Sequence, residues 1–563
     1  MILAAAALFY IALGTYAVVR GRTWSDEVTY VAKSWWYIKG LVAPYSDADA
    51  TWYMPLYFYQ LGLTQAVFGF GLVTGRIASL VLGALSGGVL FACCRKLTGN
   101  PTASALAVLL YLATPATTYY FATATPLSSV ALLLLAAVWL VLLGRERPSV
   151  AVSLLLGAVL ALLYFYRQNM ILAVVILAPI YILAVARRRL FHALLLAAAS
   201  AALSAVILGA FPDKLGAYAV RLPVLTPILR SLGWLPPDFE MILATTNTPL
   251  SWALELGRLS WQDPYNAFLL PYLGTILAAS ALFFLRGRVR FWLLAPAVFL
   301  FLAATHYLGS VGYCATCILT YTNYFVGIGA LGGGLTFAAI WAARERRNLR
   351  PLDGVLPVCA AAIMLNVFAP AAVISSAPAI IEGFTSFPAP MLRQVRPIQE
   401  MDEMKLLARD IEQGLPPGVP VLVLHNLPSI TYAVALSGHV LPPQSLNLWQ
   451  SYREVRAGLA PEEQAATVRA LRNESLWSDA ILADWIASGY GAVVYQEDLI
   501  PRPMLEAALD RHFDLAKRVD YRGWKIRLYV RRSQVETQAV PPEAARRMVC
   551  ELEFIRRGFG TGC

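Results

Sequence analysis

The sequence predicts an α-helical polytopic membrane protein with about eleven transmembrane helices and a C-terminal soluble α/β domain. Hydrophobic residues make up 58% of the 563 residues and charged residues only 14%, which is far from the composition of soluble globular domains. Several apolar runs reach the ~20 residues that a helix needs to cross a bilayer. From Phe384 onward, by contrast, acidic and basic side chains are frequent and equal in number, 21 of each.

Apolar segments separated by polar breaks define the predicted membrane helices. The first segment, Ile2 to Val19, is long for the apolar region of a cleavable signal and is predicted to be an uncleaved helix. The eleven helices are predicted at residues 2–19, 74–92, 101–118, 126–143, 150–166, 170–186, 192–210, 266–285, 291–308, 323–342 and 354–376.

The breaks between these helices alternate in charge, which predicts the orientation. One set is short and basic, and the other holds the long loops 20–73 and 212–265. The positive-inside rule places the basic set in the cytoplasm, so the long loops and the chain beyond residue 377 are predicted to face outward from a bacterial-type inner or plasma membrane. The basic set comprises Arg95-Lys96, Arg145, Arg147, Arg187 to Arg189, Arg286, Arg288, Arg290, Arg344, Arg346, Arg347 and Arg350.

The net charge of +11 lies entirely in the first 383 residues. Such a balance is typical of contact with anionic lipid headgroups and of cytoplasmic anchoring. The sequence has no basic stripe with interleaved aromatic residues, so nucleic-acid binding is not predicted.

The region 384–563 is predicted to be a small outward-facing α/β domain. "VPVLVL" (419–424) and "GAVVYQ" (491–496) have the pattern of buried strands, and "WKIRLYVRR" (524–532) that of a half-buried strand. "QEMDEMKLLARDIEQG" has helical spacing of apolar residues and ends at a glycine. No glycine-rich nucleotide-binding motif occurs in this region.

Six of the seven cysteines occur in three pairs along the chain: Cys93-Cys94, Cys314 and Cys317, and Cys550 and Cys563. The first pair, near the cytoplasm, is predicted to be free. A disulfide or two packed thiols is favoured for the second pair, because a structural zinc site would need two further ligands. The third pair could also form a disulfide. No metal and no other cofactor is predicted.

Loop 20–73 carries two adjacent carboxylates, Asp26 and Glu27, just after the first apolar run. One interpretation is a helix cap with a solvated neighbour, because aspartate favours helix starts. The other is a general base at the membrane surface, where partial desolvation adjusts the pKa. The aromatic segment that follows, "TWYMPLYFYQLGLTQAVFGFG", is predicted to form a short interfacial helix that begins at Pro55.

The order of motifs along the first 95 residues resembles that of a known superfamily. Asp26-Glu27 follows the first helix, Tyr53-Met54-Pro55-Leu56-Tyr57 opens the aromatic segment, and Gly69 to Arg76 leads into the second membrane helix. In this order the sequence resembles the glycosyltransferase-C superfamily, in particular the branch of the protein O-mannosyltransferases and aminoarabinose transferases. The many-helix plan with a C-terminal outward domain extends the resemblance coarsely to the whole chain.

The resemblance implies an inverting glycosyltransferase, with mannosyl transfer as the first expectation. Its substrates would be a polyprenyl-phosphate-sugar donor and a lipid, glycan or protein acceptor on the outer face. Asp26 is the expected general base that removes the proton of an acceptor hydroxyl. Glu27 is expected to orient either the acceptor or a basic side chain.

A leaving lipid phosphate needs stabilisation of its charge, which an arginine at the outer boundary can supply through a fork of hydrogen bonds. Arg167 is the first candidate, Arg76 the second, and Lys33 a further one. A snorkelling or structural role is an equal alternative for Arg167 and a stronger one for Arg76. The expected substrate cleft is lined by Tyr30, Tyr53, Tyr57 and Tyr324.

The sequence departs from the superfamily pattern at three places. The aminoarabinose transferases have Glu-Lys-Pro-Pro-Leu where this chain has Trp52 to Leu56, so that donor is not expected. The segment "YYFATATPLSS" (119–129) offers only hydroxyl side chains where many relatives have an acid or an arginine. Thr322-Asn323-Tyr324 stands where an Arg-Tyr pair is frequent.

Two other classes of protein are consistent with the composition. A transporter or flippase of lipid-linked sugars would place ionisable residues near the middle of the bilayer, whereas the predicted spans hold almost none. A non-catalytic membrane scaffold of the same fold is the third hypothesis, because some secondary motifs are missing.

Overall fold

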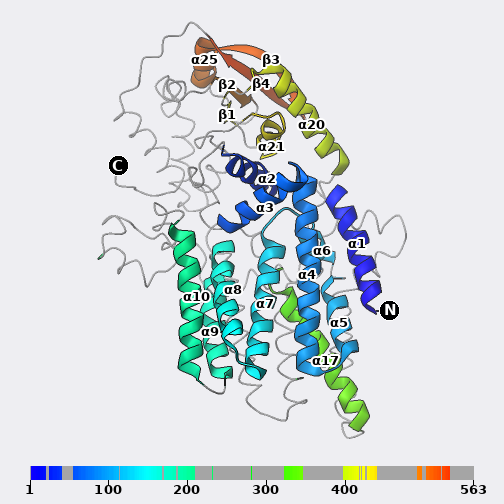
Figure 1. The fold of residues 1–563 in the computed structure, drawn as a ribbon. Coiled ribbons are helices and arrows are strands. Elements are labelled where there is room, and N and C mark those ends of the chain that lie inside the picture. Colours follow the sequence, from blue (N-terminus) through cyan, green and yellow to red (C-terminus); the bar gives the residue numbers. More distant parts are fainter. Residues whose placement is uncertain are drawn as a thin grey trace, which may run out of the picture.

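The computed structural model shows a bundle of apolar helices with a smaller mixed α/β region at one end (Figure 1). Two helices, α2 (Ser25–Ile38) and α3 (Pro55–Phe68), lie between the bundle and the strands. The structure describes residues 2–20, 25–40, 55–112, 115–167, 170–185, 188–209, 231, 281, 323–346, 397–417, 419, 421–424, 428–439, 491–497, 503–521 and 523–532.

The described bundle consists of apolar helices of different lengths, most of which run side by side (Figure 1). Four helices in the described part of the chain, α1, α4, α7 and α10, are long and apolar enough to cross a membrane. The bundle helices are α1 (Ile2–Arg20), α4 (Leu72–Thr98), α5 (Pro101–Leu112), α6 (Pro115–Phe121), α7 (Leu127–Glu146), α8 (Val150–Tyr166), α9 (Ile171–Ala184), α10 (Arg189–Gly209) and α17 (Val326–Arg346).

One predicted helix is divided in two. The sequence analysis expected a single helix over residues 101–118, but α5 ends at Leu112 and α6 begins at Pro115. Proline disfavours helical conformation in the residue before it and is well suited to the first position of a new helix. The other predicted helices up to residue 210 agree with observed helices to within a few residues, and so does the helix at 323–342. Those at 266–285, 291–308 and 354–376 fall outside the described residues.

Loop 20–73 contains more helix than predicted. The short helix expected at Pro55 is observed as α3, whereas α2 was foreseen only as the alternative of a helix start at Asp26. Gly69, Phe70 and Gly71 separate α3 from α4.

The C-terminal elements form a four-stranded sheet with helices packed beside it. The strand order is β1-β2-β4-β3, with β1 parallel to β2 and the other neighbours antiparallel. The sequence analysis predicted three of these strands and missed β3. The elements are α20 (Pro397–Gly414), β1 (Val421–Leu424), α21 (Pro428–Leu436), β2 (Ala492–Gln496), α25 (Pro503–His512), β3 (Phe513–Tyr521) and β4 (Trp524–Arg531).

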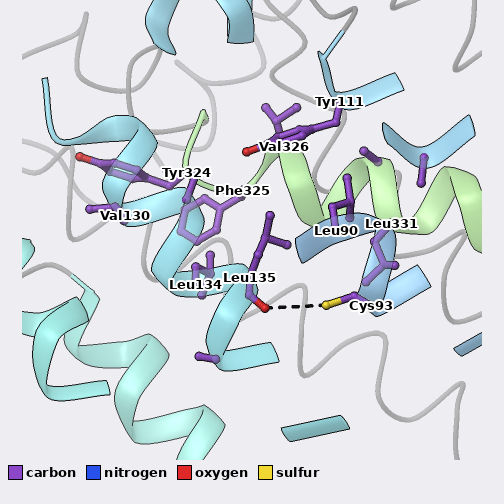
Figure 2. Packing of buried hydrophobic residues seen from close by; sticks show 14 of the residues in the cluster. Leu90, Cys93, Tyr111, Val130, Leu134, Leu135, Tyr324, Phe325, Val326 and Leu331 are labelled. Atoms are coloured by element: carbon purple, nitrogen blue, oxygen red, sulfur yellow. Dashed lines mark hydrogen bonds between the residues drawn. The ribbon is translucent and has the colours of Figure 1, made fainter. Parts of the chain in front are cut away.

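Two separate groups of buried apolar side chains stabilise these parts. The bundle core joins α1, α4 to α10 and α17, and Figure 2 shows Leu90, Tyr111, Leu135 and Phe325 packed within it. The second core contains residues of α2 and α3 together with residues of α20, α21 and the sheet. The C-terminal elements therefore share a core with the helices that follow α1.

Basic connections between helices gather at one end of the bundle. The described basic connections, Arg95-Lys96, Arg145, Arg147 and Arg188-Arg189, lie where α4 and α7 end and α10 begins. That end is opposite to the end that carries α2, α3 and the sheet (Figure 1).

Candidate active site

A fully buried ion pair joins the first turn of α2 to the beginning of α4. Arg76 donates from Nε to Oε1 of Glu27 at 2.8 Å and from Nη2 to Oε2 at 2.7 Å. Both side chains are 0% exposed. This is the bidentate geometry with which a guanidinium binds a carboxylate most specifically. Since an isolated charge would be costly to bury, each residue requires the other, and the pair fixes α2 against α4.

Two further hydrogen bonds extend the pair to neighbouring elements. The backbone N–H of Ala124 donates to Oε1 of Glu27 at 2.6 Å, and Arg76 Nη1 donates to the carbonyl of Val18 at 3.0 Å. A Cβ atom on Gly75 would lie only 2.8 Å from the Cβ of Ala124. The glycine therefore allows α4 to approach the turn before α7, and four segments of the chain meet at the ion pair.

The Glu27 carboxylate is engaged on both oxygens. Of the two partners expected for Glu27, an acceptor or a basic side chain, it contacts the basic side chain of Arg76, and its role in the reaction stays a prediction. The interpretation of Glu27 as a solvated neighbour of a helix cap is wrong, since the side chain is fully buried. For Arg76, the sequence favoured a structural role over binding of a donor phosphate. Its buried ion pair with Glu27 is an environment of that structural kind.

Asp26 lies in the first turn of α2, directly before Glu27. Its side chain is outside the described part of the structure, as is the whole of Tyr53. The general-base role of Asp26 therefore stays a prediction.

Aromatic side chains pack around α2 and α3 beside the ion pair. The ring of Tyr30 meets the rings of Tyr57 and Phe58 edge to face, with centroids 6.0 Å and 5.3 Å apart. Tyr57 is 1% exposed. Burial, and after it the negative charge of Glu27, raises the pKa of the Tyr57 hydroxyl well above its usual value. The structure thus brings together Glu27, Arg76, Tyr30 and Tyr57.

Arg167 and Lys33 are half-buried at the same end of the molecule. Arg167 follows the last residue of α8, where its backbone N–H donates to the carbonyl of Leu163 at 3.1 Å. Its neighbour Tyr166 packs against the core of α2 and α3. Lys33 lies on α2. Their roles in binding a donor phosphate stay predictions.

Tyr324 lies in a different environment from the other predicted cleft residues. It is 2% exposed and belongs to the bundle core, whereas Tyr30 and Tyr57 belong to the second core. Figure 2 shows it beside Val130 and Phe325. The described contacts do not bring Tyr324 to the Glu27–Arg76 pair.

The sequence analysis missed two contributors to this site. One is the backbone N–H of Ala124, in the segment that offers only hydroxyl side chains. The other is Tyr432 of α21, whose hydroxyl oxygen accepts the backbone N–H of Leu72 at 2.9 Å. Neither carries a sequence signal, because one is a main-chain group and the other lies 360 residues away from its partner.

Cysteine and metal-ligand predictions are tested only in part. Cys93 and Cys94 are free, as predicted, and both are buried. The described residues contain no group of three or more His, Cys, Asp or Glu side chains that could hold a metal ion. The other two cysteine pairs lie outside the described residues.

Comparisons with known proteins agree with this architecture. Residues 51–212 match the family model described as dolichyl-phosphate-mannose-protein mannosyltransferase. The structure of ArnT from Cupriavidus metallidurans bound to undecaprenyl phosphate has a TM-score of 0.54 and 14% identity, and the match covers 94% of this chain and 97% of that chain. The apo state of ArnT gives a TM-score of 0.52 and 16% identity over the same shares.

A more distant match is the oligosaccharyltransferase of Archaeoglobus fulgidus in the apo form. Its TM-score is 0.48 with 13% identity, covering 99% of this chain and 77% of that chain. No curated protein sequence matches this chain. The chain is an integral membrane protein with the fold of the glycosyltransferase-C superfamily. The family match over residues 51–212 and the fold shared with ArnT agree with the resemblance to this superfamily that the sequence predicts.

Proposed function

We propose that this protein is an inverting glycosyltransferase that moves a sugar from a polyprenyl-phosphate donor to a lipid, glycan or protein acceptor on the outer face of the membrane. The fold, the family match over residues 51–212 and the likeness to an ArnT structure that holds undecaprenyl phosphate support this function. The observation that carries it is the buried Glu27–Arg76 fork, which fixes the start of α2 and leaves Asp26 as the other carboxylate of the pair.

Helix geometry separates the two adjacent carboxylates. Successive residues of an α-helix are turned by about 100° from one another, so Asp26 and Glu27 occupy different faces of α2. By the spacing of three, four and seven residues, Asp26 shares its face with Thr29, Tyr30 and Lys33. Thr29 and Lys33 are partly exposed, whereas Tyr30 is buried. This mixed face, distinct from that of the buried Glu27, supports the proposal that Asp26 is the base.

The proposed reaction uses Asp26 as base and a basic side chain at the leaving group. Asp26 takes the proton of an acceptor hydroxyl while that oxygen attacks the anomeric carbon. The bond from this carbon to the phosphate oxygen breaks, its electron pair stays with the polyprenyl phosphate, and the anomeric configuration inverts. Arg167 is proposed to stabilise the leaving phosphate, in preference to Arg76, whose guanidinium is bound to Glu27.

The position of the charges favours surface chemistry over transport. The buried pair lies at the start of α4, where Arg76 is the fifth residue of a 27-residue helix, not near its middle. The described basic connections lie at the opposite end of the bundle, which the positive-inside rule assigns to the cytoplasm. Both observations support a site at the outer boundary of the membrane.

Sealed vesicles that carry the protein test this function. They are incubated with radiolabelled polyprenyl-phosphate-mannose or polyprenyl-phosphate-pentose, together with envelope lipids and glycans as acceptors. We expect conversion of one donor to free polyprenyl phosphate with its label in an acceptor, at a rate above that of vesicles without the protein. Movement of intact donor across the membrane without conversion would instead support a flippase. If the donor is neither converted nor moved, the result would support a non-catalytic scaffold.

A further inference from the structure

We propose that Tyr432 is a positioning residue through which the C-terminal region holds the membrane site in its active geometry. This inference rests on the proposed function, because the geometry in question is that of the Asp26-Glu27 turn. It concerns a contact between α21 and the first turn of α4.

Helix α4 begins without a cap of its own. Its N-cap residue is Gly71, which has no side chain that could accept a hydrogen bond. The first backbone N–H groups of a helix have no partner within the helix and need one from elsewhere. At Leu72 this partner is the hydroxyl oxygen of Tyr432, at 2.9 Å and buried.

The tyrosine is held firmly against this helix start. Its ring packs on Phe70 with centroids 5.7 Å apart, and Phe70 in turn packs on Trp35 of α2 at 5.3 Å. Burial raises the pKa of the Tyr432 hydroxyl to about 12. The hydroxyl therefore stays neutral at physiological pH.

The contact leads directly to the ion pair. Leu72 and Arg76 are four residues apart, so they lie one above the other on the same side of α4. Displacement of the first turn at Leu72 would displace the guanidinium that binds Glu27, and with it the first turn of α2. Tyr432 is close enough for the charges of Arg76 and Glu27 to act on its hydroxyl.

A second link ties the same helix start to α2. Gln65 at the end of α3 is fully buried and accepts the backbone N–H of Gly71 at 3.3 Å. Its amide donates to Ser34 Oγ at 2.8 Å and to the carbonyl of Val31 at 3.1 Å. The two consecutive N–H groups that open α4 are thus held by α3 and by α21, and only the second of these belongs to the C-terminal region.

The substitution Tyr432→Phe removes the acceptor and keeps the ring. The matched control is Tyr495→Phe, which removes a buried hydroxyl of β2 that donates to Glu506 at 3.1 Å, away from α4. In the full-length protein we expect Tyr432→Phe to lower kcat about fivefold to tenfold, the effect of losing one hydrogen bond. The donor KM should stay within about twofold, since a base acts only in the transition state. Tyr495→Phe should leave both constants unchanged.

Hydrogen exchange supplies a readout that does not depend on turnover. The peptide containing Leu72 to Arg76 should take up deuterium faster in Tyr432→Phe than in the wild type, and at the wild-type rate in Tyr495→Phe. Equal exchange in the two variants, or faster exchange with unchanged kcat, would overturn the positioning role while the proposed function stands. A wild-type protein that consumes no donor would overturn the proposed function and, with it, a positioning role in that reaction.

Discussion

At the scale of the residue, the Asp26-Glu27 pair divides into two roles. The buried carboxylate of Glu27 accepts two hydrogen bonds from Arg76 and one from the backbone N–H of Ala124. These contacts are typical of a residue that stabilises the fold. Asp26 directly precedes Glu27 in the first turn of α2. The pair is therefore better understood as one structural acid beside one candidate base than as two equivalent carboxylates.

This division predicts the effect of Glu27→Gln on stability. The substitution leaves Arg76 charged, buried and without its carboxylate, which typically costs about 3–5 kcal/mol. We expect a large fall in the midpoint of thermal unfolding in detergent. The control Glu146→Gln removes a partly exposed pair with Lys96, and pairs of that kind contribute little. Equal midpoints for the two variants would contradict the structural role of Glu27.

At the scale of the element, close helix contacts depend on particular glycines. A Cβ atom on Gly157 of α8 would lie 2.4 Å from the backbone oxygen of Leu196 in α10. The same two helices are joined by a hydrogen bond from Ser200 Oγ to the Gly157 carbonyl at 2.7 Å. Small residues permit such approaches between membrane helices.

Gly157→Ala is therefore expected to be destabilising although alanine is the better helix former. The added methyl group meets backbone atoms that cannot move aside, so α8 and α10 must separate. Gly88→Ala in α4 is the matched control, because nothing lies within 4 Å of a Cβ atom there. Replacing glycine by alanine in a helix stabilises it by about 1 kcal/mol, and we expect this gain in stability only for Gly88→Ala. Thermal unfolding that ranks Gly157→Ala at or above Gly88→Ala would refute this packing.

The predictions from sequence succeeded for helices whose own residues were enough to identify them. Long apolar runs and Pro55 were sufficient for most helices, because length and helix-start chemistry are local properties. The break before Pro115 was overlooked within a continuous apolar run. Strand β3 was missed because most of its central residues are exposed, so it lacks the apolar alternation of a half-buried strand.

The candidate site was harder to predict because its contacts are not local. The motif Asp26-Glu27 was visible, and a basic partner for Glu27 was one of two expectations. That this partner is Arg76 follows only from the crossing of α2 and α4. The contributions of Ala124 and Tyr432 depend on tertiary contacts that leave no pattern in a single sequence.

At the scale of the whole molecule, the C-terminal region and the helices α2 and α3 form one structural unit. Their apolar side chains lie in one core, with Val31 and Phe58 on one part and Met404, Ile430 and Val494 on the other. Removing the C-terminal region would expose this apolar surface and the start of α4. The predicted division at residue 384 stays a prediction, and the shared core indicates that the two parts stabilise each other.

This shared core predicts that a chain ending at residue 383 is unstable. We expect it to aggregate after extraction in mild detergent, where the full-length protein elutes as a single species in size-exclusion chromatography. The physical reason is the loss of the apolar partners of α2 and α3, since burial of such surface is the main stabilising contribution. A monodisperse truncated protein that melts within a few degrees of the full chain would show that the shared core is dispensable.

The most direct test of the central claim is the donor turnover of Asp26→Asn in purified, full-length protein. With a polyprenyl-phosphate sugar that the wild type consumes, we predict a fall in kcat of at least about a hundredfold, the typical contribution of a general base. The melting midpoint should stay at the wild-type value, because Glu27 and Arg76 keep their contacts. Asp26→Asn turnover equal to that of the wild type would contradict the account.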